Sequence, residues 1–109
     1  AEKNGTGVCV RLVQSDPENF CRPAVDPMFR SVASVYGSGV LGVILTGMGH
    51  DGRDGSKTVI EHNGMIVAQD EKSSVVWGMP GAVATAGLAS KVLPLADIGA
   101  YLRRRAGGR

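Results

Sequence analysis

Apolar residues along this chain fall into short runs with two different periodicities. Residues 40–45 form a continuous apolar run, which is typical of a parallel strand covered on both faces. Residues 8–13 instead alternate apolar and less apolar positions, so they predict a strand with one buried face. Asp26 followed by Pro27 predicts a helix start, because the aspartate can accept free amide bonds and proline is tolerated at the first helical position. Gly37 is expected to end that helix.

The rest of the chain continues this alternation of helices and strands. Helices are predicted at about residues 54–63, 80–86 and 97–105, a helical turn at 73–77, and strands at 65–69 and 91–93. Gly64 and Gly87 are the expected left-handed caps of the first two helices. The order predicts an α/β fold: a doubly wound, mainly parallel sheet with helices on both faces, in three αβα layers.

The first residues of the chain do not fit this alternation of helices and strands. Residues 1–13 contain a single half-exposed strand without the βα unit that would open such a fold. We therefore interpret residues 1–109 as the C-terminal part of a domain whose first half is absent. A sheet that lacks neighbours exposes a strand edge and apolar side chains, so the isolated chain is expected to self-associate.

Composition narrows the classes of function. With 43% hydrophobic and 20% charged residues among 109, the chain reads as globular, and no apolar run reaches the length needed to cross a bilayer. The net charge of +2 comes largely from arginines at the end of the last predicted helix, and aromatic residues make up 5%, so nucleic-acid binding is not expected. Cys9 and Cys21 lack metal-site spacing and are expected to be free thiols. We predict a cytoplasmic protein without membrane insertion, metal or cofactor.

Candidate chemistry lies in the glycine-rich loop at residues 46–52, TGMGHDG, between a predicted strand and a predicted helix. Ligands of parallel α/β sheets bind at the carboxyl ends of strands, where this loop lies. Gly47, Gly49 and Gly52 have the G-x-G-x-x-G spacing of a dinucleotide-binding loop. Asp70, eighteen positions after Gly52, stands near the place of a ribose-binding acid. A dinucleotide site is therefore one interpretation.

Asp51 argues against that interpretation. Its carboxylate would lie at the helix N-terminus, where an anionic pyrophosphate needs room. A carboxylate there is suited to orient and support an imidazolium brought from another loop. The plainer alternative is that Asp51 only makes a turn and caps the following helix.

Several further segments favour the second of these three interpretations. They are residues 22–26 (RPAVD), 35–37 (VYG), 42–52 (GVILTGMGHDG), 68–71 (AQDE), 73–80 (SSVVWGMP) and 92–95 (VLPL). In these segments the chain resembles the C-terminal half of the catalytic domain of CheB-type chemotaxis protein-glutamate methylesterases. The loop motif together with Gly-Met-Pro is far more specific than a glycine pattern alone.

The resemblance implies an activity and two site residues. Such enzymes hydrolyse glutamate methyl esters on methyl-accepting chemotaxis receptors and often deamidate receptor glutamines, with a Ser-His-Asp triad. Asp51 matches the triad aspartate, which fixes the histidine tautomer and stabilises its charged form. Met48 matches a loop residue whose backbone N–H helps to hold the oxyanion.

The other catalytic parts of the family pattern are missing from this chain. The serine and histidine motifs lie N-terminal to the matching region, as does a receiver domain that links such enzymes to the chemotaxis histidine kinase. Ser73 and Ser74 lack a nucleophile elbow, His50 occupies a variable position, and His62 is expected at the surface. We expect the parent protein to be the enzyme and the isolated chain to be inactive. A non-catalytic interaction module is the remaining alternative.

Overall fold

The computed structural model describes residues 1–107, so Arg109 lies outside the described residues. Its centre is a parallel sheet in the order β3-β4-β5, formed by β3 (Leu41–Ile44), β4 (Met65–Gln69) and β5 (Lys91–Leu93). Four helices accompany the sheet in the described part: α1 (Val25–Tyr36), α2 (Arg53–Glu61), α3 (Gly78–Thr85) and α4 (Leu95–Ala106). A short 3₁₀ turn, η1 (Gly37–Gly39), links α1 to β3. The predicted parallel α/β fold is therefore confirmed.

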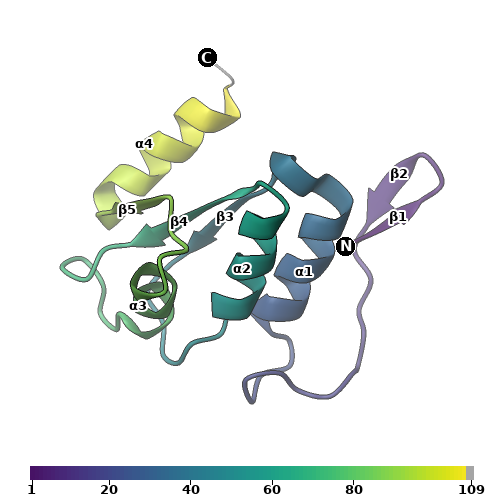
Figure 1. Ribbon diagram of the computed structural model, residues 1–109, viewed down its shortest axis with the longest axis horizontal. Helices are drawn as coiled ribbons and strands as arrows, with labels where there is room; N and C mark the ends of the chain where they lie inside the picture. The colour runs from purple at the N-terminus through teal and green to yellow at the C-terminus, as the bar shows by residue number, and fades with distance from the viewer. Residues whose placement is uncertain (108–109) are drawn as a thin grey trace.

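One face of the sheet carries most of the core. Gly42 of β3 pairs with Ile66 of β4, and the absence of a side chain at Gly42 lets Phe29 of α1 approach, since a Cβ there would lie 3.2 Å from the ring. Buried side chains from α1, α2, α3 and the sheet meet at this face; they include Phe29, Ala33, Ile44, Val59, Ile66 and Val83. In Figure 1, α1 and α2 lie side by side against β3 and β4.

Helix α4 covers part of the opposite face. Side chains alternate between the two faces of a strand, so Met65 and Val67 point away from the Ile66 side. Arg105 of α4 reaches Met65, with its Nη2 3.2 Å from the sulfur, and Ile98 and Tyr101 are buried. Leu41 and Val43 of the edge strand remain half-buried. The helices thus lie on both faces of the sheet, but β3 is only partly covered. Among residues 1–107, no helix is both long and apolar enough to cross a bilayer.

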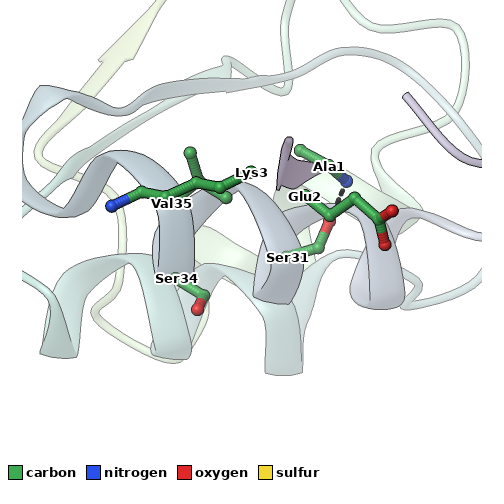
Figure 2. A pocket seen from close by; sticks show the side chains of 6 residues that line it. All are labelled: Ala1, Glu2, Lys3, Ser31, Ser34 and Val35. Carbon is green, nitrogen blue, oxygen red and sulfur yellow. Dashed lines mark hydrogen bonds between the residues drawn. The ribbon is translucent and has the colours of Figure 1, made fainter. Parts of the chain in front are cut away.

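The predicted half-buried strand at residues 8–13 is wrong. Only β2 (Gly7–Cys9) is extended, and it pairs antiparallel with β1 (Glu2–Asn4) in a small hairpin apart from the main sheet. Val10 and Leu12 are 87% and 93% exposed. In the described part of the chain no neighbouring strand pairs with these residues, and an unpaired segment does not become a strand. Figure 2 shows the first three residues against α1, where the N-terminal ammonium donates to Ser31 Oγ at 2.6 Å.

Two local predictions also need correction. The left-handed residue after α2 is Asn63, with φ of 67°, and not Gly64. Gly64 is needed for packing instead, because a Cβ there would lie 2.7 Å from Val59 Cγ1. Residues 73–77 do not form a helical turn, because Ser73 N–H donates to the side chain of Asp70 and the chain then extends toward Trp77. Gly87 does take the predicted left-handed conformation, with φ of 73°.

Gly55 allows the close contact between α1 and α2, and this gives a first prediction. A Cβ at Gly55 would lie 2.8 Å from Phe29 Cβ and 2.9 Å from Asp26 Cα, neither of which can swing away. We expect Gly55→Ala to lower the free energy of unfolding by about 1–3 kcal/mol, as overpacked sites do. Gly99→Ala in α4 is the matched control, since its Cβ meets nothing within 4 Å and should stabilise the helix by up to about 1 kcal/mol. Thermal unfolding that shifts equally in both variants would contradict the packing argument.

The open edge of β3 gives a second prediction. Among residues 1–107, Leu41 and Val43 lack full cover, β3 has no partner strand on its outer side, and the segment with Val10 and Leu12 is exposed. Unpaired backbone groups and uncovered aliphatic side chains favour association with a second copy. We expect residues 1–109 alone to elute from size-exclusion chromatography as dimers or larger species. A monomer with a single cooperative melting transition would contradict this expectation.

Candidate functional site

The loop at residues 46–52 follows β3 and is held from its far side by the segment before α3. Gly47 N–H donates to Val76 C=O at 2.9 Å, and Met79 N–H donates to Gly47 C=O at 2.9 Å. Thr46 Oγ1 exchanges hydrogen bonds with the backbone of Val76 at 2.8 and 2.9 Å. The two segments that carry the most specific sequence motifs therefore form one unit.

Gln69, at the end of β4, ties this unit to the sheet. Its side chain is 1% exposed, and its Oε1 accepts the Thr46 N–H at 2.8 Å while its Nε2 donates to Ser73 C=O at 2.8 Å. The indole N–H of Trp77 donates to Gln69 C=O at 2.9 Å. The sequence pattern did not identify Gln69 as a site residue, because a polar residue at the end of a strand does not reveal which groups it hydrogen-bonds to. A buried amide with its hydrogen bonds satisfied is a rigid support.

Met48 lies at the outer tip of the loop. Its side chain is 80% exposed. No acceptor lies within hydrogen-bonding distance of its backbone N–H among residues 1–107. The adjacent Gly49 has φ of 86°, a conformation that favours glycine. The Met48 N–H is therefore free to bind a substrate oxygen.

Asp51 lies at the base of the loop and is 8% exposed. Its Oδ2 accepts the Val25 N–H at 2.7 Å, and its Oδ1 accepts the Asp26 N–H at 3.1 Å and an Asn19 Nδ2–H at 2.9 Å. These backbone donors belong to the first turn of α1. Asp51 thus caps the preceding helix, whereas the plainer interpretation had it capping the following one.

Asp26 makes the reciprocal contact. Its carboxylate is 3% exposed, and Oδ1 accepts the Gly52 N–H at 2.9 Å and the Gly55 N–H at 2.7 Å, at the start of α2. Its Oδ2 accepts an Asn19 Nδ2–H at 2.7 Å. We predicted that Asp26 accepts amide hydrogen bonds at the start of its own helix, α1. This was wrong, because its carboxylate accepts them at the start of α2. Asp51, which precedes α2, therefore caps α1, and Asp26, in the first turn of α1, caps α2.

This exchange of caps leaves no place for a pyrophosphate at α2. The amides of Gly52 and Gly55 that would face the phosphates are already bonded to Asp26 Oδ1, and its negative charge repels an anion. The geometry therefore favours the carboxylate interpretation of the loop over the dinucleotide interpretation.

Asp51 retains capacity for one more donor. A carboxylate has about four lone-pair positions, and three hydrogen bonds reach Asp51, two of them at Oδ1. The second position of Oδ2 has no donor among residues 1–107, so Asp51 keeps the capacity to accept one more hydrogen bond. A histidine N–H is such a donor, and a buried carboxylate is suited to receive it.

The serines and histidines considered as alternatives lie in other contacts. Ser73 Oγ donates to Asp70 Oδ1 at 2.6 Å, and Ser74 Oγ donates to Asp70 C=O at 2.7 Å. The Ser73 hydroxyl and the Ser73 N–H, which both donate to the Asp70 carboxylate, hold the pKa of Asp70 below its usual value. His50 is exposed, and His62 Nδ1 lies 2.8 Å from Thr58 C=O at the exposed end of α2, as expected for a surface residue. The described residues therefore bring no serine and histidine together with Asp51.

Comparisons with known proteins agree with this geometry. The family model of CheB methylesterases matches residues 3–102. A protein-glutamate methylesterase/protein-glutamine glutaminase of Rhodospirillum rubrum is 60% identical over 99% of this chain and 28% of the relative. One from Rhodospirillum centenum is 57% identical over 97% of this chain and 27% of the relative. The chain thus spans less than a third of the length of these relatives.

A solved structure shows the same fold. The crystal structure of the Thermotoga maritima CheB methylesterase catalytic domain matches with a TM-score of 0.80 and 43% identity, over 82% of this chain and 47% of that domain. Together with the match of the family model over residues 3–102, this establishes that the chain belongs to the CheB methylesterase family.

Proposed function

We propose that this chain forms the C-terminal part of a protein-glutamate methylesterase that acts on methyl-accepting chemotaxis receptors. The observation that carries the proposal is the buried carboxylate of Asp51, which is held by three hydrogen bonds and keeps one lone-pair position open beside the loop of Met48. The relatives are named as methylesterases and glutaminases. The same site in this protein removes methyl groups from glutamate esters and deamidates receptor glutamines.

In the proposed reaction, Asp51 accepts the Nδ1–H of a histidine from the N-terminal half of the domain. That histidine takes the proton of a serine, whose oxygen attacks the ester carbonyl carbon. The Met48 N–H stabilises the resulting oxyanion. Methanol leaves with the proton from the histidine, and water then hydrolyses the acyl-enzyme to give the glutamate carboxylate and the free serine.

The proposed partners follow from this assignment. The N-terminal half of the same domain supplies the serine and histidine and covers the open edge of β3. A receiver domain in the same protein connects it to the chemotaxis histidine kinase, and the receptors are the substrates. The proposed setting is the cytoplasm.

The experiment that tests the function is methanol release from a methyl-esterified chemoreceptor. The full-length protein should release methanol, and ammonia from a receptor that carries glutamines at the same sites. Asp54→Asn is a suitable control, because Asp54 lies in the first turn of α2 with its side chain exposed and without contact to Asp51. A full-length protein with intact serine and histidine motifs that releases neither product would overturn the proposal.

A further inference from the structure

The two aspartates and Asn19 form one closed set of hydrogen bonds. Asp51 binds the first amides of α1, Asp26 binds the amides of Gly52 and Gly55, and the Asn19 amide group donates to both carboxylates at 2.7 and 2.9 Å. We propose that Asp26 and Asn19 are positioning residues that aim the open lone pair of Asp51 at the histidine. This inference rests on the proposed function.

Asp26 acts on Asp51 through the backbone. The Gly52 N–H, which belongs to the peptide bond that follows Asp51, donates to Asp26 Oδ1 at 2.9 Å. Gly52 has φ of 101°, a conformation that favours glycine, so the chain turns sharply there. The bond to Asp26 fixes that turn, and with it the direction in which the Asp51 side chain leaves the backbone.

Asn19 acts on Asp51 directly, from a rigid turn. Glu18 and Cys21 exchange two backbone hydrogen bonds of 3.0 and 2.8 Å, and Asn19 at the turn takes φ of 54°, which asparagine tolerates better than most residues. Glu18 also pairs with Arg30 of α1 at 2.6 Å, and this hydrogen bond raises the pKa of Arg30. The turn is thereby anchored to the same helix whose N-terminus Asp51 caps.

The donors around Asp51 are all neutral. Two are backbone amides and one is the Asn19 side chain, and no ion pair reaches Asp51 in the described part of the chain. A lysine or arginine at that place would compete with an imidazolium for the charge of the carboxylate. Neutral donors hold its geometry and leave its charge available, which is what a positioning role requires.

Asp26→Asn and Asn19→Ala in the full-length enzyme test the inference. Asparagine at position 26 keeps one oxygen for Gly52 and Gly55 but cannot accept the bond from Asn19, and alanine at 19 removes the bridge without a change of charge. We expect each variant to lower kcat by about ten- to hundred-fold with KM unchanged, as small misplacements of catalytic groups do. The double variant should be no worse than the more affected single one, because both single variants remove the hydrogen bond between Asn19 and position 26 and leave the bond from the Gly52 N–H in place.

The pH profile separates positioning from a loss of folded protein. A less well aimed Asp51 supports the imidazolium less, so the pKa of the histidine falls and the acid limb of kcat/KM should move to lower pH. A variant that is only less stable loses amplitude and keeps its midpoint. Thermal unfolding identifies an assay temperature at which every variant is folded. If Asp26→Asn does not fold, the Asn19→Ala variant alone tests the positioning role.

The outcomes distinguish this inference from the function on which it rests. Near-normal activity of Asp51→Asn would overturn the proposed triad role itself. An inactive Asp51→Asn beside Asp26→Asn and Asn19→Ala variants that match Asp54→Asn in kcat and pH midpoint would overturn the positioning role and leave the function standing. Additive losses in the double variant would also contradict it.

Discussion

Asp51→Asn should lower the turnover of the full-length enzyme by about ten-thousand-fold, the loss seen when the aspartate of a serine protease triad is replaced. Asparagine offers an N–H where the carboxylate accepts one, so the histidine adopts the wrong tautomer and its charged form loses support. Methanol release from a methyl-esterified chemoreceptor measures the effect. Activity within a few-fold of the unmodified enzyme would return Asp51 to a purely structural role.

The same substitution also disturbs the fold, and the two effects need to be separated. Asp51 accepts amide bonds from Val25 and Asp26 at 2.7 and 3.1 Å, and asparagine can accept at only one of its two terminal atoms. We expect a loss of about 1–3 kcal/mol in the free energy of unfolding, the usual cost of a buried donor left without a partner. Thermal unfolding of the variant shows whether enough folded enzyme remains to assign the lost turnover to chemistry.

Met48→Pro should lower kcat by about a hundred- to thousand-fold, as the removal of one oxyanion donor does. Proline has no N–H, and the Met48 N–H, like those of Gly49, His50 and Asp51, has no acceptor among the described residues. Met48→Ala is the matched control, because it removes the exposed side chain and keeps the N–H. Equal losses in both variants would show that the side chain, not the amide, matters.

The sequence predicted those parts of the fold that depend on local pattern. The continuous run at residues 40–45 became β3, and Met65–Gln69 became β4 with the predicted bounds, because each strand pairs with a neighbouring strand that this chain itself supplies. The prediction for residues 8–13 failed because a strand there requires a partner strand that residues 1–107 do not supply beyond Cys9. Periodicity predicts which face of a strand is buried, but it does not identify the element that covers that face.

The site was predictable only at its centre. The motif around Asp51 marked the loop, but the partners of its carboxylate come from residues 25 or more positions away in the sequence. Asp26 was visible as a helix start, and its pattern gave no sign that it caps a different helix. Asn19 was not singled out at all, since a lone asparagine before a phenylalanine has no local pattern that reveals two carboxylates nearby.

The exchange of helix caps between Asp26 and Asp51 affects how the sequences of relatives of this chain should be interpreted. A lineage that loses the serine or the histidine no longer needs a triad, yet replacement of either aspartate would still remove two backbone hydrogen bonds from the start of one helix. Selection for a folded protein would therefore preserve Asp51 long after catalysis had ended. An inactive descendant should still carry the motif TGMGxDG, so the presence of that motif identifies ancestry, and only the serine and histidine report whether the chemistry survives.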